Sequence, residues 1–166
     1  MSIRPGWFYH PEEEPHSLER LMRTYMTSVG GSALFNLNIP PMPSGRFDPR
    51  DVQRLKDFGD ALKEAFGQEL SVPHTVARED VSETQCVFRI DFAEETAVNY
   101  IALREDISQG QRVERFVIES DGSRLTDGTT VGSLRICPLN GAKTRQLKLW
   151  IVAARDHVPS LDIRLY

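Results

Sequence analysis

The sequence predicts an α+β chain in two parts, with helices around one short strand in residues 1–70 and a β-sandwich or barrel in residues 71–166. Two observations carry this prediction. Apolar residues recur at helical spacing in the first part, whereas the second part consists of short apolar runs separated by turn residues. A length of 166 residues, of which 40% are hydrophobic and 27% charged, suits one medium globular domain or two small ones.

Two helices are predicted in the first part. Ser17 can cap the first helix, and Gly30 and Gly31 end it because glycine readily takes the left-handed C-cap conformation. Asp48 caps the second helix, and Pro49 occupies its first turn, where the missing N–H costs nothing. The two apolar stripes comprise Leu18, Leu21, Met22, Tyr25, Met26 and Val29, and Val52, Leu55, Phe58, Leu62 and Phe66.

Between the helices, the apolar run at residues 33–39 predicts a buried strand that ends at Pro40 and Pro41, since proline cannot donate to a strand ladder. The run is apolar on both faces, as in parallel sheets covered by helices. One strand cannot form a sheet by itself. We therefore expect its neighbouring strands to precede Met1 in a longer protein.

Beyond a boundary at residues 71–74, short strands and turns alternate in the manner of a sandwich or barrel. Leu147, Leu149 and Ile151 alternate with polar or amphipathic neighbours, which predicts one buried face. The expected strands are residues 85–92, 97–104, 113–119, 131–139, 145–153 and 161–165.

Composition excludes several classes of function. The net charge of −4 comes from both signs spread along the chain, without the basic stripe that nucleic-acid binding requires. No apolar run reaches the length of a membrane span. Cys86 and Cys137 lack metal-ligand spacing and the histidines are scattered, so no metal site or cofactor is predicted. Both cysteines lie in apolar runs, which favours buried free thiols over a disulfide between them.

Three stretches carry a resemblance to a known family. They are residues 2–10, residues 28–41 with the helix around residues 54–59, and residues 103–113 with Gly128–Gly132 after them. In this order they resemble the α-L-fucosidases of glycoside hydrolase family 29, in the branch that ends in a galactose-binding-like sandwich. The resemblance covers nearly the whole chain.

The resemblance implies the last strand and helices of a catalytic (β/α)8 barrel at residues 1–70 and an antiparallel, galactose-binding-like β-sandwich at residues 71–166. Family members release terminal α-linked L-fucose from glycans with retention, using one carboxyl group as nucleophile and another as acid/base. No residue here matches the nucleophilic aspartate, and the acid/base is expected upstream of Ser2 as well. The expected partners are therefore a fucosylated glycan and the remainder of the barrel, and the chain alone is expected to be inactive. Family members are commonly secreted, periplasmic or lysosomal.

Barrel active sites lie at the C-terminal ends of the strands, which places residues 3–10 and Asn38 toward the sugar. Trp7 either presents its indole face to the C–H patch of a hexose or packs under the loop. Arg4 either reaches a sugar hydroxyl or forms a structural ion pair, and His10 either lines the site or lies on the surface. Asn38 either offers its amide to a polyol or makes a strand-end hydrogen bond.

Two further clusters invite interpretation. The acidic run Glu12–Glu14 precedes a helix start, where a solvated charge run is favoured over a catalytic carboxylate. The second cluster comprises Arg104, Glu105, Gln111 and Arg112. It either contacts glycan or the barrel, or it pins a strand-to-loop corner. The favoured interpretation is the structural one, in which these residues pin the corner through ion pairs and backbone hydrogen bonds.

The sequence leaves a second function open. The sandwich is either a supporting part of an enzyme or a non-catalytic module that binds carbohydrate or buttresses the barrel. An unrelated α+β fold would explain the helices but not the isolated buried strand.

Overall fold

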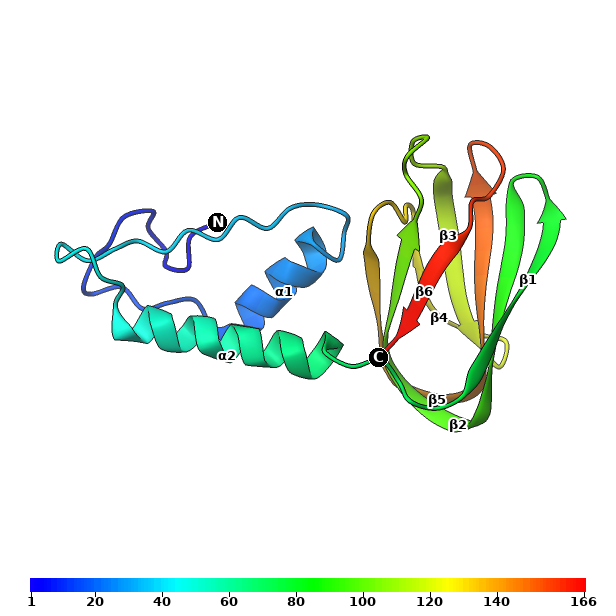
Figure 1. Cartoon of the computed structure of the whole chain (residues 1–166), viewed down its shortest axis with the longest axis horizontal. Coiled ribbons are helices and arrows are strands. Elements are labelled where there is room, and N and C mark those ends of the chain that lie inside the picture. Colours follow the sequence, from blue (N-terminus) through cyan, green and yellow to red (C-terminus); the bar gives the residue numbers. More distant parts are fainter. The chain divides into compact units, whose positions relative to one another are not determined.

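A computed structural model describes residues 1–166, which divide into two compact units. The first unit comprises residues 1–29 and 33–68, and the second comprises residues 30–32 and 69–166. Both helices belong to the first unit and all named strands belong to the second (Figure 1).

Both predicted helices are confirmed. Helix α1 spans Leu18–Ser28, and the Oγ of Ser17 accepts a hydrogen bond from a backbone N–H of its first turn at 3.2 Å. Helix α2 spans Pro49–Phe66, and Asp48 caps it in the same way at 2.9 Å. Neither helix has the apolar length that a membrane crossing requires. Tyr25 of α1 contacts two rings of α2, edge-on against Phe58 and stacked on Phe66.

The end of α1 lies where the sequence predicts it, but the expected left-handed glycine cap is wrong. Val29 is the C-cap and is right-handed, with φ −60°. The left-handed residue that follows is Ser32, with φ 66°. Gly30 instead belongs to the second unit, where its carbonyl accepts a hydrogen bond from the N–H of Ile136 at 2.9 Å.

The strand predicted at residues 33–39 is wrong for this chain. The segment is irregular, and Asn38 forms one isolated parallel bridge with Ser2. Leu34 is 97% exposed, so the segment is not buried on both faces. A ladder needs neighbouring strands on its flanks, and the neighbour beside this bridge is the short Met1–Ile3 segment, which hydrogen-bonds Asn38 through backbone groups.

The second unit is an antiparallel six-stranded sheet folded upon itself. The strand order is β1-β2-β5-β3-β4, and β6 pairs with β2. The bounds are His74–Ser82 for β1, Gln85–Glu105 for β2, Val113–Ser120 for β3, Ser123–Gly128 for β4, Arg135–Ala154 for β5 and Leu161–Leu165 for β6.

The long strands β2 and β5 build both layers of the sandwich. Each merges two predicted strands, so the predicted breaks at residues 93–96 and 140–144 are wrong. Their mutual pairing shifts register between Asp91 and Thr96, and β2 pairs with β1 before this bend and with β6 after it. Both strands curve at the bottom of the unit, so that their halves face each other (Figure 1). The predicted antiparallel β-sandwich is therefore confirmed as one bent sheet.

Two strands lie where the sequence analysis predicts none. All nine residues of β1 are exposed, and β4 is mostly polar and has no buried residue. Both strands end the sheet order, so each has a strand neighbour on one side only. An edge strand with no buried face carries no apolar alternation, which is why the sequence pattern did not reveal it.

One cluster of buried apolar side chains fills the space between the facing halves of the sheet. Its central members are Phe88, Ile90, Ile101, Leu103, Phe116, Leu147, Leu149 and Ile151. Along β5, Lys148 is exposed and Trp150 is half-buried between these inward residues, as the predicted alternation requires.

Both cysteines are buried free thiols, which confirms the favoured interpretation. Burial raises the pKa of Cys137 to about 11 and also raises the pKa of Cys86. Neither thiol is therefore poised as a nucleophile, because nucleophilic attack requires the thiolate.

Candidate functional site

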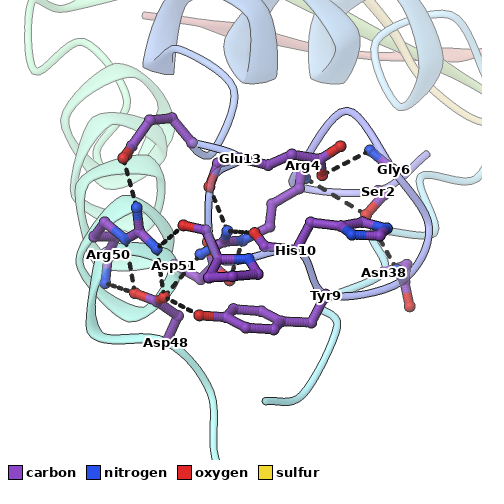
Figure 2. A network of polar contacts seen from close by, with 12 residues as sticks. Ser2, Arg4, Gly6, Tyr9, His10, Glu13, Asn38, Asp48, Arg50 and Asp51 are labelled. Atoms are coloured by element: carbon purple, nitrogen blue, oxygen red, sulfur yellow. Dashed lines mark hydrogen bonds and ion pairs between the residues drawn. The ribbon is translucent and has the colours of Figure 1, made fainter. Parts of the chain in front are cut away.

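One buried side chain, that of Arg4, organises the N-terminal loop (Figure 2). Its Nε donates to both carboxylate oxygens of Asp51, at 3.0 and 2.9 Å. Its Nη1 donates to the backbone carbonyls of His10, at 2.9 Å, and of Glu13. Its Nη2 lies 3.1 Å from Oδ2 of Asp48 as an ion pair without hydrogen-bond geometry. One guanidinium thus joins the loop to two carboxylates.

These carboxylates come from the start of α2. Asp48 is the N-cap and Asp51 lies in the first turn, where the helix dipole favours negative charge. Arg50 binds Asp48 through Nε at 3.0 Å and Nη2 at 2.8 Å, and the hydroxyl of Tyr9 donates to Oδ2 of Asp48 at 3.0 Å. Two arginines therefore pair with two aspartates, and Arg50 also pairs with the exposed Glu14 at 2.6 Å.

Asp48, Arg4 and Arg50 carry their charges at neutral pH, because their pKa values are shifted toward the ionised forms. The side-chain and backbone hydrogen bonds of Arg50 hold the pKa of Asp48 well below its usual range, against the opposing effect of burial. Burial lowers the pKa of Arg4. The hydrogen bond and charge of Asp51, together with the charge of Asp48, raise this pKa by more than burial lowers it, so that the net shift is upward. Buried charges persist in a protein when they are paired and hydrogen-bonded in this way.

Acid is expected to destabilise the first unit through Asp48. The pKa of Asp48 in the folded chain lies below its ordinary value of 3.8. Its contribution to stability is therefore present above the unfolded-state pKa and is lost as the pH falls toward the folded-state value. We expect the wild-type melting temperature, followed by helical circular dichroism, to fall between about pH 5 and pH 2 more steeply than that of Asp48→Asn.

The exposed aspartate Asp127 provides the control for this measurement, because it pairs with Arg124 on the surface of the other unit. Asp127→Asn is expected to keep the wild-type pH dependence. If Asp48→Asn lost stability with acid as steeply as the wild type, Asp48 would not be the group responsible.

Two of the four residues predicted to bind the sugar expose their rings. Trp7 is 58% exposed and does not pack beneath the loop, and its neighbour Phe8 is 76% exposed. The side chain of His10 is exposed as well, while its carbonyl is bound by Arg4. The indole of Trp7 can therefore meet a ligand, and the imidazole of His10 lies on the same loop.

The other two predicted residues bind the loop from within. Arg4 has no exposed surface and forms the structural ion pair described above. The Nδ2 of Asn38 donates to Oγ of Ser2 at 3.1 Å (Figure 2). It also donates to the carbonyl of Trp7 at 2.8 Å. The structure thus joins Arg4 to His10 and Asn38 to Trp7, in each case through a backbone carbonyl.

The sequence analysis missed the partners of this loop. Asp51, Asp48 and Tyr9 were not singled out as partners of Arg4, and Glu13 was assigned to a solvated charge run. Glu13 is half-buried, and its Oε2 accepts a hydrogen bond from the N–H of Gly6 at 3.1 Å. The helix dipole already accounts for an aspartate in the first turn of α2, so the sequence carried no separate signal for the pairing of Asp51 with Arg4.

In the sandwich, the structural interpretation of Glu105 and Gln111 is confirmed. Glu105 is buried at 5% exposure, and its carboxylate accepts hydrogen bonds from the backbone N–H groups of Arg112, Val113 and Gly132. Gln111 donates to the carbonyl of Val113 at 3.1 Å. These bonds pin the corner between β2 and β3.

Comparison with known proteins extends these observations. No protein-family model matches the chain. Alpha-L-fucosidase 1 of Arabidopsis thaliana is 30% identical over 188 aligned residues, which cover 93% of this chain and 37% of that protein.

Two solved structures match almost the whole chain. The structure of SpGH29 matches with a TM-score of 0.89 and 31% identity, over 99% of this chain and 42% of that one. A family 29 fucosidase of Ruminococcus gnavus, in complex with fucose, matches with a TM-score of 0.89 and 25% identity, over 99% of this chain and 40% of that one. The chain therefore spans about two fifths of the length of these relatives. It matches these α-L-fucosidases over almost its whole length, and it belongs to glycoside hydrolase family 29, as its three motif stretches indicate.

Proposed function

We propose that this chain works as the C-terminal part of a retaining α-L-fucosidase, which releases terminal α-linked L-fucose from glycans. The observation that carries this proposal is the match over 99% of the chain to family 29 structures, one of them a complex with fucose. Residues 1–70 then supply the last part of a (β/α)8 barrel, and residues 71–166 supply a sandwich that supports it.

Direct contact with the sugar is assigned to Trp7 and His10, whose rings are exposed. An indole face suits the apolar C–H patch and the methyl group of fucose, and an imidazole can donate to or accept from a hydroxyl. Arg4 and Asn38 belong to the same site through the loop backbone that they bind.

The catalytic carboxylates are assigned to the part of the barrel that this chain does not contain. Retaining hydrolysis uses two carboxyl groups about 5–5.5 Å apart, both of which must reach the glycosidic bond. Near the loop, Asp51 is fully buried against Arg4, and Asp48 is bound by Arg50 and Tyr9. Both carboxylates are already engaged in hydrogen bonds within the chain, so neither is free to act on a glycosidic bond. We therefore expect the chain alone to be inactive.

Activity assays test this proposal. The chain alone, given a chromogenic α-L-fucoside, is expected to show no turnover above a variant with Glu12, Glu13 and Glu14 replaced by alanine. A chimera that joins the N-terminal part of the Arabidopsis thaliana relative to this chain is expected to turn over the substrate. In that chimera Trp7→Ala is expected to lower kcat/KM by about 10- to 100-fold. A folded chimera that is inactive, or unaffected by Trp7→Ala, would contradict the proposal.

A second candidate function is a non-catalytic carbohydrate-binding sandwich, which one observation favours. A cavity of about 350 Å³ lies on the outer face of the sheet, lined in part by Arg89, Lys148 and Trp150. Small-molecule sites combine aromatic and apolar walls with a few polar groups that fix the orientation of the ligand. Glycan binding that survives Trp7→Ala but is lost in Trp150→Ala would favour this function.

A further inference from the structure

The loop that carries Trp7 is closed by the first of its own residues. Arg4 Nη1 donates to the carbonyl of His10 at 2.9 Å, so that one hydrogen bond joins the two ends of a seven-residue segment with Trp7 at its centre. The same nitrogen also binds the carbonyl of Glu13 (Figure 2). Closing a loop in this way removes much of the conformational freedom of the residues within it.

A second contact fixes the centre of the segment. Asn38 lies far along the chain, and its Nδ2 donates to the carbonyl of Trp7 at 2.8 Å. Asn38 is itself held in place, because its N–H donates to the carbonyl of Met1 at 2.9 Å and its carbonyl accepts from the N–H of Ile3 at 2.8 Å. The backbone of Trp7 is thus held at both flanks and at its middle, although its ring is exposed.

Two acidic residues at the start of α2, the N-cap Asp48 and Asp51, fix the guanidinium that closes the loop. All three of its nitrogens face a partner: Nε faces Asp51, Nη1 faces the two loop carbonyls and Nη2 faces Asp48. A lysine carries a single ammonium group, which cannot contact Asp51, the two loop carbonyls and Asp48 at the same time. The arrangement therefore requires arginine, and not merely a positive charge.

From these contacts we propose that Arg4 and Asn38 are positioning residues: they hold Trp7 in place for the sugar and do not touch the sugar themselves. The proposal rests on the proposed function for the identity of the ligand, L-fucose, but the rigidity of Trp7 is a property of the chain alone. Fixing the backbone that presents an exposed ring before the ligand arrives reduces the conformational entropy lost on binding.

The test measures the local motion of Trp7 by time-resolved fluorescence anisotropy, with Trp150→Phe as the background so that Trp7 is the sole tryptophan. The variants are Arg4→Lys, which keeps the charge, and Asn38→Asp, which keeps the shape but replaces the donor with an acceptor. Arg23→Lys is the matched control, since Arg23 forms an exposed ion pair with Glu19 on α1.

In both loop variants, the share of the anisotropy that decays through fast local motion is expected to rise at least about twofold, and the control is expected to match the background protein. The unfolding midpoint is measured in parallel, because a loss of stability alone leaves the motion of Trp7 in the folded state unchanged. If the local motion of Trp7 is unchanged in the folded Asn38→Asp variant, the proposal is overturned. The Asn38→Asp variant provides the test alone if Arg4→Lys does not fold.

Activity of the chimera separates this proposal from the proposed function. If both are right, Arg4→Lys and Asn38→Asp raise KM more than they lower kcat, and Trp7→Ala removes any further effect of Asn38→Asp. If the variants free Trp7 but the chimera hydrolyses no fucoside, the positioning role stands and the proposed function fails. If the chimera is active but Trp7 stays rigid in both variants, the positioning role fails alone.

Discussion

Replacing Glu105 with alanine is expected to lower the free energy of unfolding of the sandwich by about 3–5 kcal/mol. The carboxylate accepts hydrogen bonds from three backbone N–H groups, those of Arg112, Val113 and Gly132. Alanine leaves these donors without an acceptor, and each buried unsatisfied donor costs about 1–3 kcal/mol. The corner between β2 and β3 would then have to open to water or remain unsatisfied.

Urea denaturation followed by tryptophan fluorescence measures this loss. Glu114→Ala is the matched control, because Glu114 accepts a hydrogen bond from Arg155 at 2.8 Å but both side chains are largely exposed. Exposed pairs contribute about 0–1 kcal/mol. Equal losses for the two variants would show that the buried carboxylate does not pin the corner.

Replacing Phe116 with alanine is expected to destabilise the sandwich by about 3–5 kcal/mol, because the ring is fully buried in the core. Its partner across β3 and β4 is Gly128. A Cβ added at Gly128 would lie 2.5 Å from Cζ and 2.6 Å from Cε1 of the ring. Gly128→Ala alone is therefore expected to cost about 1–3 kcal/mol through overpacking.

The double variant tests this steric explanation. Once the Phe116 ring is gone, the methyl group at residue 128 fills part of the cavity, so Gly128→Ala should become neutral or stabilising in the Phe116→Ala background. The coupling energy between the two sites should then exceed about 1 kcal/mol. Gly59→Ala serves as the control, because a Cβ there meets nothing within 4 Å, and it should not destabilise. Additive losses at residues 116 and 128 would contradict the clash.

Much of the local structure followed from the sequence. The caps at Ser17 and Asp48 and the two apolar stripes predicted α1 and α2, because side-chain caps and helical periodicity are properties of neighbouring residues. The alternation along Leu147–Ile151 identified the inward face of β5, and the last predicted strand coincides with β6. The three motif stretches indicated the family that the comparisons show.

The candidate site was predicted only in part. The loop around Trp7 and the end of the run at Asn38 were singled out, and the structure brings them together. The partner of Arg4 was not predicted, because Asp51 lies 47 positions away and a charge pattern does not state which opposite charge it meets. The ion pair and the exposed indole are both consequences of how the loop and α2 pack.

The sequence by itself determined the helices, their caps, the inward faces of the central strands and the family, all of which depend on short-range patterns of residue type. The tertiary structure alone decided that β2 and β5 each bend through both layers, that β1 and β4 join as polar edges, and that residues 33–39 form one bridge instead of a strand. The physical reason is the same in each case. Backbone pairing and buried ion pairs form between distant segments, and their free energy depends on neighbours that local periodicity does not encode.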